Sequence, residues 1–199
     1  MMGYEEVWAP AVRRPEGKGV WMPYRLIKTS SGEYMINEHF LKYVEVKRNI
    51  AALIRAPPGT WEQEPNLEMR VLEGSQINDE QLQSLLESVL EEEIEVLRGM
   101  PKTRPVIELI KIFRKKLDES EYIRRERRRN EAKWVIWILE KRMRVKDGIK
   151  CLRRVYIPMD LLEDSLIDLN KGTEDKALTL LARSDIGIRK RVNDILVGL

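Results

Sequence analysis

The sequence predicts an α+β protein in which a small β-rich N-terminal domain precedes a mainly helical bundle domain. Two contrasts along the chain predict this fold. Residues 1–60 are interrupted by proline and glycine at short intervals, which favours short strands and turns. Residues 78–199 carry apolar residues at helical spacings over long stretches. Residues 61–77 contain Pro65 and Gly74 with little apolar periodicity, and we interpret them as a connector between the two domains.

The clearest local unit of the first domain is a hairpin. The runs 24–28 and 33–36 flank the sequence Thr-Ser-Ser-Gly, whose composition fits a turn with glycine at positive φ. After the hairpin, Asn37 can cap a short helix that continues through Val44. Residues 45–54 fit either a helix or a strand, because their apolar positions do not settle on one period.

An acidic helix is predicted after the connector. Asn78 or Asp79 can cap it, and Gly99 and Pro101 stop it shortly after Leu97. One face is rich in leucine and the opposite face is acidic. The acidic residues between 79 and 97 are Asp79, Glu80, Glu87, Glu91, Glu92, Glu93 and Glu95, with no lysine or arginine among them. A second amphipathic helix is predicted to begin near Pro105.

The longest predicted helix spans residues 121–157 and is strongly basic. It contains no proline and one glycine over about ten helical turns. Apolar positions form one wide stripe, and the remaining face carries thirteen Lys or Arg against five Asp or Glu, a net charge of +8. Pro158 ends this helix. A short acidic helix over residues 159–169 and a last helix capped by Thr173 are predicted to follow.

Three interpretations of the basic run 124–129 stay open. It is a solvated helix face held by acid–base pairs, a docking surface for an acidic partner, or a phosphate-backbone contact. The acidic partner could be the helix 79–97 of this chain or of another copy. Trp134 and Trp137 lie three positions apart on overlapping helix faces, and we expect one of them in the core. The other either is a second core residue, which is the more economical interpretation, or lies near the rim, where tryptophan often contributes strongly to binding. The candidate contact residues for a partner or nucleic acid are Arg124, Arg125, Arg127, Arg128, Arg129, Trp137, Arg142 and Arg144.

The sequence offers little material for catalysis. None of the phosphate-loop, dinucleotide, zinc-protease or nucleophile-elbow motifs is present. His39 is the single histidine and Cys151 the single cysteine, which excludes an intrachain disulfide and a His-pair or cysteine-cluster metal site. We interpret His39 as a structural or surface residue and Cys151 as a small core or boundary residue. No catalytic residue, cofactor or metal site is therefore expected, and we expect a non-enzymatic protein.

The N-terminal segment and the lengths of the apolar runs predict the cellular location. The N-terminus lacks the apolar segment of a signal peptide, and no apolar run is long enough to span a bilayer. We expect a soluble cytoplasmic protein, or a nuclear one in a eukaryote, with no membrane partner. The high content of charged residues, with one cysteine, is similar to that of thermophile proteins.

Residues 80–170 resemble a subunit of the GINS family, tetrameric replication factors that bind the replicative helicase. The resemblance consists of a Leu-rich acidic helix ending near LRGMP, the helix VIELIKIF, and the Arg-rich stretch RRERRRNEAKWVIWILEKRMRVKDGIKCLRRVYIP followed by an acidic segment. The segment APPGTW also resembles the junction in those family members that carry the small β-rich domain first. The resemblance implies a non-enzymatic scaffold in a DNA replication complex. Its partners would be paralogous or identical subunits in a hetero- or homotetramer, replicative helicase components, and DNA. The alternative is a nucleic-acid-binding protein that uses the basic helix 121–157.

Overall fold

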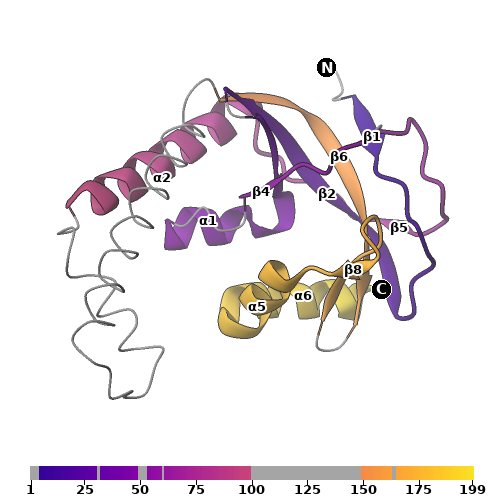
Figure 1. Ribbon diagram of the computed structural model, residues 1–199. Helices are drawn as coiled ribbons and strands as arrows, with labels where there is room; N and C mark the ends of the chain where they lie inside the picture. The colour runs from indigo at the N-terminus through magenta and orange to yellow at the C-terminus, as the bar shows by residue number, and fades with distance from the viewer. Residues whose placement is uncertain (1–4, 31, 49–52, 60, 100–148, 163–164) are drawn as a thin grey trace, which may run out of the picture.

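The fold is a mixed α+β structure dominated by a curled, mostly antiparallel sheet (Figure 1). The computed structural model describes residues 5–30, 32–48, 53–59, 61–99, 149–162 and 165–199. The strands are β1 (Glu6–Trp8), β2 (Lys18–Thr29), β3 (Gly32–Asn37), β4 (Leu53–Arg55), β5 (Arg70–Val71), β6 (Lys150–Leu161), β7 (Leu166–Asp168) and β8 (Thr173–Glu174). The helices are the 3-10 turn η1 (Glu38–Phe40), α1 (Leu41–Lys47), α2 (Asp79–Gly99), α5 (Lys176–Ser184) and α6 (Ile186–Gly198).

The prediction of a mainly helical bundle is wrong. Residues 150–157, the described end of the predicted basic helix, belong to strand β6, and the predicted helix 159–169 is the end of β6 followed by β7. Residues 121–148 lie outside the described residues. The three strands after residue 149 join the same sheet as β1 to β5, so the sheet draws on both ends of the chain.

The two long strands β2 and β6 form the centre of the sheet. They pair antiparallel from Lys18 opposite Leu161 to Lys28 opposite Lys150, with an irregularity between Leu26 and Ile27. The order of the sheet is β4-β3-β2-β6-β7-β8. On their outer sides, β5 lies parallel to one end of β2, and β1 lies parallel to the middle of β6.

Successive side chains of these segments alternate between the two faces of the sheet, as they do in a strand. In β2, the side chains of Val20, Met22, Tyr24 and Leu26 enter one core cluster, whereas Trp21 enters an aromatic cluster on the other face. This is the two-residue period of a strand. Because both faces are covered, residues 20–27 of β2 and 155–161 of β6 are buried at every position and are mostly apolar, and a short run of this kind matches helical spacings equally well. The long-range pairing of β2 with β6 makes these runs strands and not helices.

A short motif, Val-(Trp/Tyr)-any-Pro, occurs three times at the centre of the sheet. It begins at Val7 in β1, at Val20 in β2 and at Val155 in β6. All three valines have an exposed fraction of 0 % and share the first core cluster. Parallel pairing sets Val7 opposite Val155, and antiparallel pairing sets Met22 opposite Ile157 at the middle of two copies.

The three aromatic residues of the motif pack together. Trp8 stacks on Tyr156 with ring centroids 4.3 Å apart, and it meets Trp21 edge to face at 5.2 Å. The indole N–H of Trp21 donates to the Leu67 carbonyl at 3.1 Å. These contacts hold β1, β2, β6 and the segment before β5 against one another, because aromatic pairs add stability beyond the area that they bury.

Two of the three prolines of the motif, those in β2 and β6, lie where the outer neighbour of a central strand changes. Pro23 lies between the part of β2 that pairs with β5 and the part that pairs with β3. Pro158 lies between the part of β6 that pairs with β1 and the part that pairs with β7. Proline has no N–H to donate to a ladder, and at these positions no ladder partner has to receive one.

The hairpin and its cap are confirmed. Strands β2 and β3 pair antiparallel up to Thr29 opposite Gly32, and Gly32 has a φ of +139°. The Asn37 side chain accepts from the His39 backbone N–H at 2.9 Å, so it caps the helical segment as predicted. Residues 53–55 form strand β4, which resolves part of the helix-or-strand alternative as a strand.

The acidic helix is also confirmed as α2. The Asn78 side chain accepts from Gln81 N at 2.8 Å and the Gln81 side chain accepts from Asn78 N at 3.0 Å, a reciprocal capping box. Its buried stripe consists of Leu82, Leu86, Val89, Leu90 and Ile94. The first four members of this stripe pack with α1 against the sheet in a second core cluster, whereas α5 and α6 cover the first. Among the described helices, none has the length and apolar character that a bilayer crossing requires.

We predict that removing one leucine from the buried stripe of α2 destabilises the protein strongly. Leu86→Ala should lower the free energy of unfolding by about 2–5 kcal/mol, because it removes buried methyl groups and leaves a cavity. Leu180→Ala on α5 makes the same chemical change at a side chain that is 65 % exposed, and should stay within about 0.5 kcal/mol. Chemical denaturation measures both. Equal effects would show that α2 does not pack on the sheet as described.

Candidate functional site

The turn η1 presents two adjacent ionisable side chains to different surroundings. Glu38 is buried, and its carboxylate lies between strands β2 and β6. His39 is half-buried and contacts the segment before α2 and helix α6. The Asn37 cap fixes the start of this turn, so both side chains take their places from one local structure.

Glu38 joins two arginines that face each other across the central strands. Arg25 and Arg154 are direct partners in the β2–β6 pairing. The Glu38 Oε1 atom accepts from Arg25 Nε at 2.9 Å and from Arg154 Nη2 at 3.1 Å, and Oε2 accepts from Arg154 Nε at 2.7 Å. The side chains of Arg25 and Glu38 are 1 % and 0 % exposed, so this ion pair is removed from water.

The outer N–H groups of the two arginines hold the chain just before α2. Arg25 donates to the Ile77 carbonyl at 2.7 Å and to the Asp79 carboxylate at 3.0 Å. Arg154 donates to the Ser75 carbonyl at 3.1 Å. A Cβ atom at position 74 would overlap the Arg154 guanidinium, so any side chain there would displace the guanidinium from its hydrogen bonds, and Gly74 allows this close approach. The network therefore fastens residues 74–79 to the sheet.

His39 is held as a neutral ring. One ring nitrogen, Nε2, lies 2.9 Å from the Glu73 carbonyl, which can only accept, so Nε2 carries the proton. The other nitrogen, Nδ1, accepts from Arg191 Nε at 3.1 Å and from Arg191 Nη2 at 2.8 Å. Burial lowers the pKa of His39, and Arg191 lowers it further, while the Glu73 carbonyl and Glu38 act in the opposite direction.

A pocket of about 690 Å³ opens beside His39, between α1 and the start of α6. Its cationic residues are Lys42, Lys47, Lys190 and Arg191, and its carboxylates are Asp185 and Asp194. Tyr43, Val46 and Ile186 supply an apolar side. Cationic groups thus exceed carboxylates by two at the wall of this pocket.

The single cysteine is not arranged for nucleophilic chemistry. Burial, together with the nearby Asp79 carboxylate, raises the pKa of Cys151 to about 11 against the opposing effect of Arg25. A thiol with such a pKa carries almost no thiolate at neutral pH. Its Sγ atom lies 3.7 Å from the Asp79 carbonyl, at the margin of the second core cluster.

The sequence did not predict this site. The predicted contact residues Arg124, Arg125, Arg127, Arg128, Arg129, Trp137, Arg142 and Arg144 all lie outside the described residues. Arg154, which was assigned to a helix face, belongs to the buried network, and Arg25 and Glu38 were not singled out. Within the described ranges, no group of three or more His, Cys, Asp or Glu side chains could hold a metal ion.

We predict that neutralising Glu38 lowers the stability of the fold strongly. Glu38→Gln removes the one fully buried carboxylate that Arg25 and Arg154 share, and leaves them only the more exposed carboxylates of Asp79 and Glu6, so it should lower the free energy of unfolding by about 3–5 kcal/mol. Glu45→Gln breaks the exposed pair with Lys42 and should change it by less than about 1 kcal/mol. Urea denaturation at neutral pH compares the two variants. A small loss for Glu38→Gln would contradict the buried network.

We also predict that His39 makes stability depend on pH. Between its lowered folded pKa and the unfolded value of about 6.5, the unfolded chain binds more protons than the folded chain. The free energy of unfolding therefore falls as the pH falls through this window. In His39→Gln, the drop in melting temperature from about pH 7.5 to about pH 5.5 should be smaller than in the unmodified protein. Identical drops would rule out this contribution.

Comparisons bring no further information on the site. The chain gives no match to a protein family, to a curated protein or to a solved structure. The functional argument therefore depends on the charges, contacts and pocket described above. The two surfaces that it concerns are the exposed face of α2 and the pocket between α1 and α6.

Proposed function

We propose that the protein is a non-enzymatic, cytoplasmic subunit of a multiprotein assembly, and that the acidic face of α2 contacts a cationic surface of a partner subunit. The observation that carries this proposal is the row of acidic residues on α2. Glu80, Glu87, Glu91 and Glu95 recur at spacings of seven and four, so they follow one face of the helix. Glu80, Glu91 and Glu95 are exposed.

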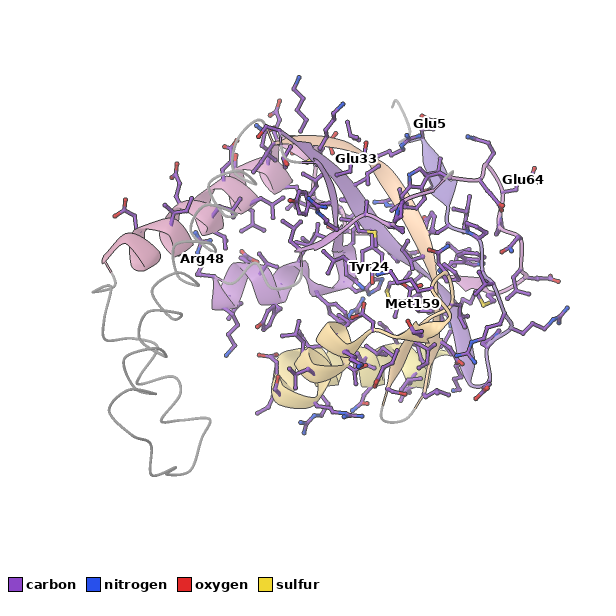
Figure 2. All side chains as sticks on the ribbon, viewed as in Figure 1. Glu5, Tyr24, Glu33, Arg48, Glu64 and Met159 are labelled. Atoms are coloured by element: carbon purple, nitrogen blue, oxygen red, sulfur yellow. The ribbon has the colours of Figure 1, made fainter. Side chains whose placement is uncertain are left out.

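A row of like charges favours a partner of opposite charge. Glutamates four positions apart on a helix repel each other, and each such pair destabilises the helix by about 0.2–0.5 kcal/mol. In the described structure, Arg48 offsets one neighbouring charge, since it donates to the Glu92 carboxylate at 2.9 Å through Nε (Figure 2). A cationic surface on a partner would meet this row of like charges and offset their mutual repulsion, and complementary charge also increases the rate and specificity of association.

The resemblance to GINS subunits gives this proposal its narrower form. In that form the protein is part of a DNA replication complex, is packed with paralogous or identical subunits in a tetramer, and links the replicative helicase to its partners. Support comes from the acidic helix α2 and from the sequence 105–148. Residues 150–157 no longer contribute to it, because they form a strand and not the end of the Arg-rich helix.

The alternative of a nucleic-acid-binding protein stays a prediction. The arginines that would contact phosphates, Arg124 to Arg129, lie outside the described residues. Of the basic stretch, the described Arg154 is committed to Glu38, and Arg153 lies 3.7 Å from the Glu5 carboxylate. No contact in the described part of the chain favours nucleic acid over a protein partner.

We predict that neutralising the α2 row weakens the assembly. The native complex is purified from its source, its mass is measured, and the partners are identified. The double variant Glu91→Gln and Glu95→Gln should then raise the dissociation constant about tenfold or more at low salt. Glu64→Gln with Glu68→Gln removes the same charge from an exposed loop, and Glu64 lies across the molecule from α2 (Figure 2).

The control should leave the dissociation constant unchanged. Equal weakening by both double variants would mean that the net charge acts, and not the face of α2. A native mass equal to that of one chain would contradict the assembly itself. If the partner proves to be DNA and no protein, the nucleic-acid alternative replaces the proposal.

A further inference from the structure

The pocket between α1 and α6 has the volume and the mixture of charged and apolar lining residues that a ligand site needs. We propose that it binds a small phosphorylated molecule that carries an aromatic or apolar body. This site lies apart from the acidic face of α2, so the inference does not depend on the proposed function. Its volume of about 690 Å³ falls within the range of about 300–1,000 Å³ that is usual for small-molecule sites.

Arg191 supplies the first reason for an anionic group. Its Nε and Nη2 atoms both donate to His39 Nδ1, and no carboxylate lies within ion-pair distance of it among the described residues. A guanidinium that donates to a neutral ring keeps its full charge for a ligand. The Nη1 group has no partner in the described structure, and arginine binds phosphate strongly through paired N–H groups.

The other charged residues that line the pocket also favour an anionic ligand. Lys190 precedes Arg191 on α6, lines the pocket and has no ion pair among the described residues. Asp185 is already engaged, because its side chain caps α6 by accepting from Ile188 N at 3.0 Å and lies 3.9 Å from Lys47. Asp194 is the remaining carboxylate, so a cationic excess is left at the wall.

The start of α6 is not counted as part of the anion site. Its first N–H groups have no partner within the helix, but the Asp185 carboxylate caps this end by accepting from Ile188 N at 3.0 Å. That carboxylate also lies close to the backbone of Gly187. The attraction for an anion therefore depends on Arg191 and Lys190.

Three apolar side chains of the lining suit an apolar body. Val46 on α1 is 62 % exposed and Ile186 at the start of α6 is 81 % exposed, although both are apolar. Tyr43 also lines the pocket and is partly buried against both core clusters. An aromatic or aliphatic group placed here would cover these side chains, which gains free energy in proportion to the apolar area removed from water.

His39 acts as a positioning residue in this site. Its proton is fixed on Nε2 by the Glu73 carbonyl, so Nδ1 always presents a lone pair to Arg191. The guanidinium is therefore held in one orientation at the wall. A protonated ring would lose this acceptor and repel the guanidinium, so acid should weaken binding at the same time as it charges the ring.

The experiment uses 1-naphthyl phosphate, inorganic phosphate and 1-naphthol as probes of the full chain by isothermal titration calorimetry. We expect 1-naphthyl phosphate to bind more tightly than either half of it. Arg191→Gln and Lys190→Gln should each weaken its binding about tenfold or more. Arg189→Gln removes the same charge from the same helix, but Arg189 does not line this pocket, so binding should stay unchanged.

A second pair of variants tests the apolar side. Ile186→Ser should weaken binding of 1-naphthyl phosphate and leave that of inorganic phosphate unchanged, whereas Leu180→Ser, an exposed leucine on α5, should alter neither. Circular dichroism confirms that each variant is folded. The proposal is overturned if 1-naphthyl phosphate fails to bind at about millimolar concentration. It is also overturned if Arg189→Gln weakens binding as much as Arg191→Gln.

Discussion

The carboxylate of Glu38, held between two arginines, is the interaction on which the rest of the fold depends. Arg25 and Arg154 are direct cross-strand partners, and like charges in that position repel. Glu38 offsets this repulsion with three hydrogen bonds, from a turn that follows the hairpin immediately. Burying three charged groups is costly unless each is paired and its remaining polar atoms are satisfied, and the Ser75 and Ile77 carbonyls complete that pairing.

This network also fixes the register of the central strands. A shift of β6 by one residue would move Arg154 to the face that holds Val155 and the first core cluster, where no counter-charge is described. The aromatic residues also fix a register, because Trp8 stacks on Tyr156 only when Val7 lies opposite Val155. The charged network thus selects one alignment of β6 with β2, and the aromatic packing selects one alignment of β6 with β1.

Local signals in the sequence predicted local structure well. The turn with Gly32, the Asn37 cap and the capping box at Asn78 each depend on a few neighbouring residues, and each was correct or close in position. Strand β6 was missed because its partner β2 lies more than a hundred positions away, and a run buried on both faces has no clear period. The repeated Val-(Trp/Tyr)-any-Pro motif was the available signal, since three copies with one spacing indicate equivalent places in one sheet.

The candidate site could not be found by residue type alone. His39 and Arg191 are separated by 152 positions, and only the packing of α6 beside α1 brings them together. The position of His39 in this contact is linked to the buried network, because His39 directly follows Glu38 in η1. Because moving the buried carboxylate would break its three hydrogen bonds to Arg25 and Arg154, the ring beside it is held in place. The stability of the strand pair therefore sets the position of Arg191 at the wall of the pocket.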